Sequence, residues 1–219
     1  LAEHPDIVAI LVEPVQGEGG VNIPDSDYLP GLRARCDRHD ILLMLDEVQT
    51  GVGRTGKFMA YQHHALVPDV VTLAKALGNG VPIGACLAQG KAAQTLTAGS
   101  HGSTFGGNPL ACRAALAVLD TLTEQALIDQ AAIMGQMLAT ALQTQLQHHS
   151  SVKDIRHLGL MLGIELNHTC SELVAQGLTQ SLLINVTQDS IIRLLPPLVI
   201  NAEHCHQIAT TVANLIKAS

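Results

Sequence analysis

Two short apolar runs, each followed by a residue of distinctive chemistry, constrain the fold most. Residues 41–45 (ILLML) lead into Asp46, and residues 70–74 (VVTLA) lead into Lys75. Short aliphatic runs bounded by turn signals are typical of buried strands in a parallel sheet. Ligands of such sheets bind beyond the carboxyl ends of the strands. The sequence therefore predicts that Asp46 and Lys75 lie at the ligand-binding edge of one parallel sheet.

The first half of the chain alternates strands and helices. Residues 7–12 read as a strand, residues 28–39 as an amphipathic helix, and residues 41–45 and 70–73 as the two strands above, while residues 83–88 can add another strand. This βαβ rhythm predicts a mostly parallel sheet with right-handed crossovers.

The pattern changes from Asn108 onwards, where a helix rich in alanine and leucine and a second, longer helix are expected. Short strands and helices then alternate: we expect helices at 110–123, 125–147, 171–181 and 202–217, and strands at 152–156, 161–165 and 191–195. We therefore predict an α/β chain in which residues 1–120 are part of a large domain and residues 121–219 are a small C-terminal α+β domain.

Composition excludes several classes of protein. Hydrophobic residues make up 47% of the chain and charged residues 14%, as in a globular protein. The net charge of −7, without a basic stripe, argues against nucleic acid as a partner. No apolar stretch has membrane-spanning length. Five cysteines without a CxxC pair indicate reduced thiols in a cytoplasmic protein, and the histidine spacing predicts no metal site.

One carboxylate and one amine at a sheet edge are the two protein groups that pyridoxal phosphate chemistry requires. A lysine forms the Schiff base with the cofactor, and an acid contacts its pyridinium nitrogen. The glycine-rich residues 76–84 after Lys75 permit a close backbone approach. For most lysines a solvated loop position is the favoured interpretation, but the apolar run before Lys75 and the glycine-rich loop after it favour a functional one. Asp46 on its own could be a strand-end carboxylate that faces water or caps a turn.

Longer motifs carry a family resemblance that spans nearly the whole chain. Residues 46–56 read DEVQTGVGRTG, and residues 73–78 read LAKALG. Further motifs are VEPVQGEGG at 12–20, HGSTFGGNP at 101–109 and IRLLPPL at 192–198. In this order they resemble the class III (fold type I) pyridoxal phosphate-dependent aminotransferases, and within that class the acetylornithine aminotransferases. The resemblance implies a partial large domain with a mostly parallel sheet and a small C-terminal α+β domain.

The resemblance assigns roles around the cofactor ring. It implies that Lys75 holds the cofactor covalently and later moves the proton of the substrate carbon. Asp46 then keeps the ring nitrogen protonated, and Gln49 hydrogen-bonds the ring hydroxyl. Glu47 and Val48 are expected to join the cofactor site as backbone and packing members of the motif.

The resemblance also implies residues for phosphate and substrate. Thr104 is expected to bind the phosphate of the neighbouring subunit's cofactor and Ser103 to touch substrate there, which implies a homodimer with shared active sites. Arg193 is expected to bind the substrate α-carboxylate, and Glu18 to pair with Arg193 as a gate between the two substrates (hypothesis). Without the resemblance, Ser103 would read as a turn or N-cap serine and Arg193 as a surface arginine.

The implied reaction has two halves. The terminal amine of N-acetylornithine passes to the cofactor and then to 2-oxoglutarate, and this order implies ping-pong kinetics. The resemblance places the reaction in arginine biosynthesis. Ornithine, succinylornithine and 4-aminobutyrate aminotransferases share these motifs and remain alternatives. Family members also carry, upstream of the part seen here, a phosphate-gripping loop and an aromatic residue stacked on the ring. We expect this N-terminal part to be absent, which makes an inactive fragment the further alternative.

A nucleotide-binding rival comes from residues 51–56, which spell GxGxxG after a predicted strand. The fingerprint requires a helix that opens within it and an acid at the end of the next strand. Here the next acid, Asp69, precedes its strand, so we reject an NAD-binding domain.

Overall fold

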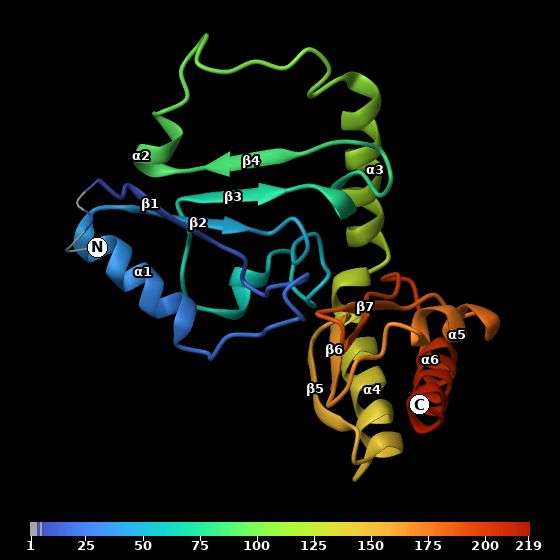
Figure 1. Cartoon of the computed structure of the whole chain (residues 1–219). Helices are drawn as coiled ribbons and strands as arrows, with labels where there is room; N and C mark the ends of the chain where they lie inside the picture. Colours follow the sequence, from blue (N-terminus) through green and yellow to red (C-terminus); the bar gives the residue numbers. More distant parts are fainter. Residues whose placement is uncertain (1–3, 5) are drawn as a thin grey trace. The chain divides into compact units, whose positions relative to one another are not determined.

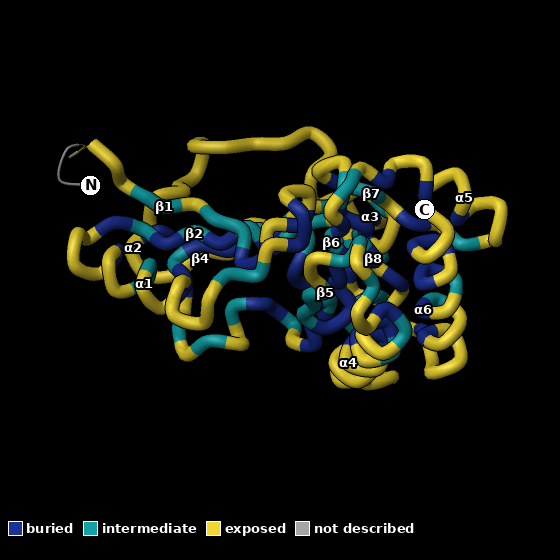
Figure 2. Tube along the Cα trace, turned by 60° about the horizontal axis from the view of Figure 1, so that its bottom comes forward, coloured by how far each residue is buried: buried dark blue, intermediate teal, exposed yellow. Residues whose placement is uncertain are grey.

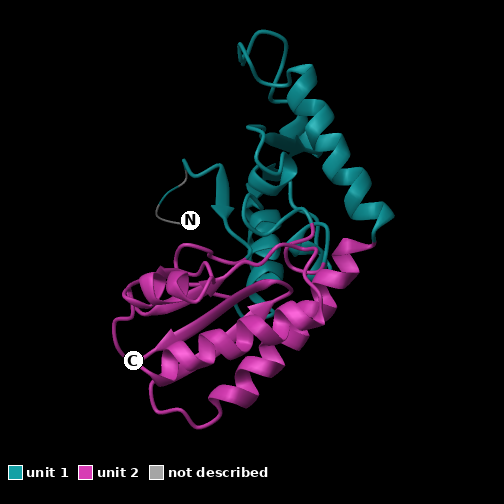
Figure 3. Cartoon of the chain, turned by 90° about the vertical axis from the view of Figure 1, so that its right-hand side faces the viewer, with its two compact units in different colours: residues 1–14, 24–52, 57–125 teal, residues 15–23, 53–56, 126–219 magenta. Residues whose placement is uncertain are grey.

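The computed structural model describes residue 4 and residues 6–219 (Figure 1). The chain divides into two compact units (Figure 3). The first unit contains residues 1–14, 24–52 and 57–125, and the second contains residues 15–23, 53–56 and 126–219. Two short segments from the N-terminal half therefore belong to the second unit.

The first unit is built on a four-stranded sheet in the order β1-β2-β3-β4. The strands β1 (Ala9–Val12), β2 (Leu42–Asp46) and β3 (Val70–Leu73) are parallel, and β4 (Ala85–Ala88) runs antiparallel to β3 (Figure 1). The predicted mostly parallel sheet is confirmed, including the extra strand that residues 83–88 suggested.

Helix α1 (Tyr28–His39) packs against β2 and buries Leu29 and Cys36. Alternate residues of β2, Leu43 and Leu45, are fully buried in the same cluster, as the two-residue period of a strand requires. Asp40, in the left-handed conformation, ends α1. The other helical segments of the unit are η1 (Ala60–His63), η2 (Lys75–Leu77), α2 (Gly90–Ala93) and α3 (Pro109–Glu124).

The second unit holds an antiparallel sheet in the order β5-β6-β8-β7. Its strands are β5 (Val152–Leu158), β6 (Met161–Leu166), β7 (Asn185–Thr187) and β8 (Ile191–Leu194). Its helices are α4 (Leu127–Leu146), α5 (Leu173–Thr179) and α6 (Ala202–Lys217). The sequence predicted every one of these elements except β7.

The central strand β6 is buried on both faces, and two different structures cover it. Leu162 and Ile164 join the core formed with α4 and α6. Met161 clusters instead with Val15 and Val21, from the short N-terminal segment 15–23. The buried stretches of this unit are dark blue in Figure 2. Burial of the second face explains why residues 15–23 belong to this unit.

The stretch 93–110 has the opposite character, because every residue in it is exposed (Figure 2). Among residue 4 and residues 6–219, no helix combines the length and the apolar character needed to cross a membrane. Within the same described part of the chain, no three His, Cys, Asp or Glu side chains gather closely enough to hold a metal ion.

Candidate active site

The register of β2 against β3 positions Asp46. Asp46 lies opposite Thr72, whose Oγ1 donates to Asp46 Oδ1 at 3.2 Å. The backbone N–H of Val48 donates to the same oxygen at 3.0 Å. Lys75 follows Thr72 by three residues, directly beyond the end of β3. Asp46 and Lys75 therefore lie at the carboxyl ends of two neighbouring parallel strands, the edge where such sheets bind ligands.

The backbone turns sharply at Lys75. Its φ of 44° lies in the left-handed region that residues other than glycine rarely adopt. Lys75 begins η2, which packs against α3, and its side chain is exposed. The turn closes tightly at Gly78, where an added Cβ would lie 2.1 Å from the carbonyl oxygen of Val81. Strained backbone of this kind concentrates at functional sites.

The carboxylate of Glu47 is buried and fully occupied inside the first unit. Its Oε2 accepts from Thr50 Oγ1 at 2.6 Å and from the N–H of Ala60 at 2.9 Å, and its Oε1 accepts from the N–H of Tyr61 at 2.9 Å. Burial raises the pKa of Glu47, although these three hydrogen bonds act in the opposite direction. The side chain therefore ties the loop after β2 to η1, and only the backbone of Glu47 remains for contact with a cofactor.

Val48 and Gln49 are half-buried in the turn that follows Asp46. The turn is closed by the N–H of Gly51, which donates to the carbonyl of Glu47 at 2.8 Å. A Cβ on Gly51 would lie 2.8 Å from the backbone oxygen of Glu47 and 2.7 Å from Leu73 Cδ2, so a side chain here would meet a rigid backbone atom. This packing holds residues 46–49 at the end of the sheet.

Ser103 and Thr104 lie on the exposed stretch 93–110 between α2 and α3 (Figure 1). Ser103 Oγ accepts from the N–H of Gly106 at 2.9 Å, which gives this serine a role in the local turn. Asn108 caps α3 by accepting from the N–H of Ala111 at 3.0 Å. The phosphate and substrate contacts of Ser103 and Thr104 stay predictions.

The second unit contains Glu18 and Arg193, and there they form an ion pair. Arg193 Nη1 lies 2.7 Å from Glu18 Oε1, and Arg193 Nε donates to Asn185 Oδ1 at 3.1 Å. The Arg193 side chain is 10% exposed, whereas that of Glu18 is 68% exposed. A largely enclosed guanidinium is thus covered by a carboxylate that reaches solvent.

Several polar residues that surround Glu18 and Arg193 were not predicted from the sequence. Thr187 Oγ1 and Gln188 Nε2 both donate to the carbonyl oxygen of Glu18, the latter at 3.2 Å. Thr187 and Asn185 lie on β7, a strand of three residues that is too short for a periodic pattern to reveal. Asp154 and Arg156 in β5 alternate with an apolar residue, and this pattern could have indicated that both charged side chains lie on one face of the strand.

Arg54 of the glycine-rich string also lies in the second unit. Its Nη1 donates to the carbonyl oxygens of Leu160, at 3.0 Å, and Pro196, at 2.6 Å. Burial lowers the pKa of Arg54 to about 10. Residues 51–56 form turns rather than the start of a helix, and Asp69 is occupied by Arg33 at 2.7 Å. Both observations agree with the rejection of an NAD site.

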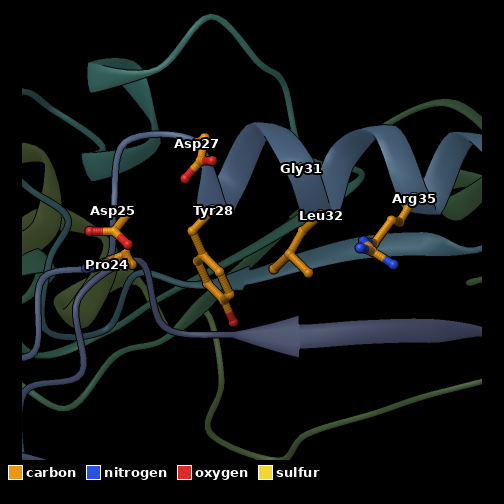
Figure 4. Close-up of a pocket in the computed structure, with 7 residues that line it drawn as sticks. All are labelled: Pro24, Asp25, Asp27, Tyr28, Gly31, Leu32 and Arg35. Atoms are coloured by element: carbon orange, nitrogen blue, oxygen red, sulfur yellow. The ribbon is translucent and has the colours of Figure 1, made fainter.

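A hollow of about 570 Å³ lies beside α1 in the first unit. Tyr28, Leu32 and Arg35 project from one side of the helix toward it (Figure 4). The remaining lining residues are Pro24, Asp25, Asp27 and Gly31. None of the predicted site residues lines it, so it is separate from the edge that carries Asp46 and Lys75.

An open, mostly parallel sheet with an acid and a lysine at its carboxyl edge, followed in the chain by an antiparallel α+β unit, defines an α/β protein of two units. The family model for class-III aminotransferases matches residues 1–216. The chain belongs to the class-III aminotransferase family, as its motifs predicted.

Named relatives are enzymes that act on ornithine or its acetyl derivative. The chain is 53% identical over 215 residues to the acetylornithine aminotransferase of Nitrosomonas europaea, covering 98% of this chain and 55% of the relative. It is 47% identical over 217 residues to ornithine aminotransferase 1 of Staphylococcus aureus, covering 99% of this chain and 55% of the relative. The chain therefore spans about half the length of the curated relatives it matches.

Solved structures agree on the fold. The acetylornithine aminotransferase of Elizabethkingia anophelis superposes with a TM-score of 0.92 at 36% identity, covering 100% of this chain and 59% of that one. The ornithine aminotransferase of Toxoplasma gondii gives a TM-score of 0.93 at 36% identity, covering 99% of this chain and 52% of that one. The predicted fold class, a fold type I transferase with a partial large domain, is confirmed.

Proposed function

We propose that this protein is a pyridoxal phosphate-dependent aminotransferase that moves the terminal amine of N-acetylornithine to 2-oxoglutarate. The observation that carries the proposal is the placement of Asp46 and Lys75 at the carboxyl ends of neighbouring strands. Family membership and the acetylornithine aminotransferases among the relatives support it. Because the chain spans about half the length of those relatives, we propose the activity for a protein of the relatives' full length.

The residues present fit the cofactor. Both hydrogen bonds described for the Asp46 carboxylate fall on Oδ1, so Oδ2 can accept from a protonated ring nitrogen. The amine of Lys75 is exposed, so a carbonyl group can reach it. Gly78 has no side chain in the tight turn after Lys75, so the backbone of this turn can lie close to the cofactor. When bound, the cofactor supplies an electrophilic carbonyl and an electron-withdrawing ring.

Each residue of this edge then has a task. Lys75 would hold the cofactor through its amine and, when that amine is free, would carry the proton that leaves the substrate carbon. Asp46 would keep the proton on the ring nitrogen, which would favour loss of that carbon-bound proton. Gln49 orients the ring hydroxyl, and Glu47 and Val48 fix the backbone of the motif. Thr104 and Ser103 serve the site of a second subunit in a homodimer.

Arg193 provides the substrate carboxylate site, because a guanidinium fork matches a carboxylate. Glu18 neutralises Arg193 while the amine donor reacts, and the carboxylate of 2-oxoglutarate displaces Glu18 in the second half-reaction. The Glu18–Arg193 contact of 2.7 Å supports this gate. Unchanged discrimination between the two half-reaction substrates after Glu18→Ala would refute it.

The amine donor admits a second candidate. Ornithine aminotransferases are also found among the relatives, at 47% identity, so ornithine is the alternative donor, with succinylornithine and 4-aminobutyrate behind it. Steady-state rates of a version extended to the relatives' length, measured with each of the four donors, decide among them. We also propose a cytoplasmic location, on the grounds of the reduced cysteines.

The cofactor proposal is tested with pyridoxal phosphate itself. Wild-type protein is expected to gain near-visible absorbance, and borohydride reduction followed by peptide mapping is expected to place the label on Lys75. Lys75→Ala should lose both signals. Lys57→Ala removes another exposed lysine of the first unit and should retain them.

Two outcomes would contradict parts of the proposal. A label on another lysine, or unchanged absorbance in Lys75→Ala, refutes the assignment of Lys75. If only the extended version binds the cofactor, the 219-residue chain is an inactive fragment of the enzyme.

A further inference from the structure

Arg156 makes polar contacts with four residues of the second unit. Its Nε donates to the carbonyl oxygens of Gly20, at 3.1 Å, and Val21, at 3.0 Å, and its Nη2 donates to Gly20 O at 2.6 Å. Its Nη1 lies 2.9 Å from both Asp154 Oδ2 and Glu165 Oε2. The side chain is 16% exposed. Two carboxylates therefore fix one end of this guanidinium, while the other holds the backbone of residues 20–21.

Residues 16–22 form a closed turn that carries Glu18 at its tip. Gln16 and Asn22 exchange backbone hydrogen bonds of 3.1 and 3.0 Å. The side chain of Asn22 donates across the turn to Gly19 O at 3.0 Å and to Gln16 Oε1 at 3.1 Å. We call residues 16–22 the Glu18 turn.

At the two residues that Arg156 holds, the Glu18 turn has backbone conformations that favour glycine, and Val21 is strained in its conformation. Gly20 has a φ of 116°, and a Cβ there would lie 2.5 Å from Ile191 Cδ1. Val21 has a φ of 55°, which is unfavourable for a β-branched residue, and it is fully buried. Such a conformation persists only when its surroundings impose it. Arg156 and the burial of Val21 against Met161 supply that constraint.

We propose that Arg156 is a positioning residue that holds the backbone of the Glu18 turn on the sheet, so that the Glu18 carboxylate reaches Arg193. Thr187 and Gln188 also hold this turn, because both donate to the carbonyl oxygen of Glu18. The backbone on which Glu18 stands is therefore fixed, and its exposed side chain is the part that can move. The Glu18–Arg193 contact is opened by rotation of that side chain, without movement of the turn.

This inference rests on the proposed function in one respect, the anionic substrate that binds Arg193. An intramolecular carboxylate competes with any carboxylate ligand of the same guanidinium. Loss of the Arg156 contacts lets the turn move and reduces the time that Glu18 spends on Arg193. A dicarboxylate should then bind more tightly, and substrate discrimination should fall.

Amide hydrogen exchange tests the positioning role without reference to activity. In Arg156→Met, the amides of Gln16 and Asn22 should exchange about tenfold faster or more, as expected for the loss of charge-assisted hydrogen bonds. The matched control is Lys153→Met, which removes a neighbouring cation 3.7 Å from Glu165 and leaves the turn untouched. Unchanged exchange in Arg156→Met, or an equal rise in Lys153→Met, overturns the proposal.

The exchange of the β6 and β8 amides reports whether each variant folds. If Arg156→Met fails to fold, Arg156→Lys replaces it, because lysine keeps the charge beside Asp154 and Glu165 but lacks the fork that spans two carbonyls. The same faster exchange of Gln16 and Asn22 is expected in Arg156→Lys, and its absence overturns the proposal.

A binding cycle with 2-oxoglutarate, on the extended protein, distinguishes positioning from general damage. Glu18→Gln should tighten binding by about fivefold, the effect of losing an ion pair whose carboxylate is exposed. Arg156→Met should shift affinity in the same direction, and it should add nothing when Glu18→Gln is already present. Weaker binding in Arg156→Met, or additive effects, overturns the proposal.

Failure of the proposed function has a different signature. If Arg193→Gln leaves 2-oxoglutarate binding unchanged, Arg193 is not the carboxylate site and the proposed substrate role fails. The exchange of Gln16 and Asn22 then still decides whether Arg156 positions the turn.

Discussion

Asp69 links three parts of the first unit, and replacing it tests how that unit holds β2 against β3. Asp69 Oδ2 accepts from Arg33 Nη1 at 2.7 Å and from the N–H of Leu43 at 2.8 Å. The N–H of Asp69 donates in return to the carbonyl of Leu43 at 2.9 Å. These contacts connect α1, β2 and the start of β3, the strands that end near Asp46 and Lys75.

The magnitudes follow from what each substitution leaves behind. Asp69→Ala removes the acceptor of a backbone N–H at the fully buried Leu43, a loss of about 1–3 kcal/mol. It also removes the ion pair with Arg33, which contributes up to about 1 kcal/mol. We expect Asp69→Ala to destabilise the first unit by about 2–3 kcal/mol. Asp69→Asn keeps an oxygen for Leu43 and should cost about 1 kcal/mol.

The charge of Asp69 also predicts a pH dependence. Burial by itself would raise the pKa of Asp69, but the hydrogen bonds from Arg33 and Leu43 outweigh it and hold the pKa below its usual value. The stabilisation is therefore complete above the unfolded-state pKa, about 3.9, and is lost as the pH falls through the folded-state pKa. The stability difference between wild type and Asp69→Asn should shrink over that range.

Urea unfolding followed by far-UV circular dichroism, with amide exchange of the β2 residues, measures these effects. The β6 amides of the second unit are the internal reference. Asp37→Ala is the matched control, because Asp37 pairs with the same Arg33 at 2.8 Å but is 65% exposed. It should cost less than about 0.5 kcal/mol. Equal effects of Asp37→Ala and Asp69→Ala, or a pH-independent difference for Asp69→Asn, would refute the reasoning.

Two further predictions concern packing and thiol reactivity. Gly135→Ala should destabilise the second unit by about 1–3 kcal/mol in urea unfolding, because the new Cβ would lie 2.0 Å from the carbonyl oxygen of Gly159. Gly31→Ala, with nothing within 4 Å in the middle of α1, should instead stabilise the first unit by about 0.5–1 kcal/mol, and a loss of stability there would contradict this. Iodoacetamide at pH 8 should modify the exposed Cys86 before Cys170, because burial raises the pKa of Cys170 to about 11; mass spectrometry of the peptides gives the order, and faster labelling of Cys170 would show the burial to be wrong.

Periodicity predicted the regular elements well. The helix at residues 28–39 and the strand at residues 70–73 have the bounds that the sequence predicted. Each has a clear apolar pattern and distinct ends. Strand β7 escaped because three residues carry no period, and it forms only through pairing with β8.

The site divides along the same line. The placement of Asp46 and Lys75 followed from strand ends alone, whereas the pairing of Glu18 with Arg193 was expected from the family resemblance. The contacts of Arg156 with Gly20 and of Arg54 with Leu160 could not be predicted, because they join residues more than about 100 positions apart that no local pattern connects.

The repeated passage of the chain between the two units has a practical consequence for anyone who cuts this protein. A truncated protein of residues 126–219 would lack two segments of the second unit. Residues 15–23 pack against Met161, and residues 53–56 carry Arg54, which donates to Leu160. Its β-sheet would expose an apolar face to water, which favours aggregation. Expression of this unit on its own would require residues 15–23 and 53–56 to be included, and residues 15–23 bring Glu18, the ion-pair partner of Arg193.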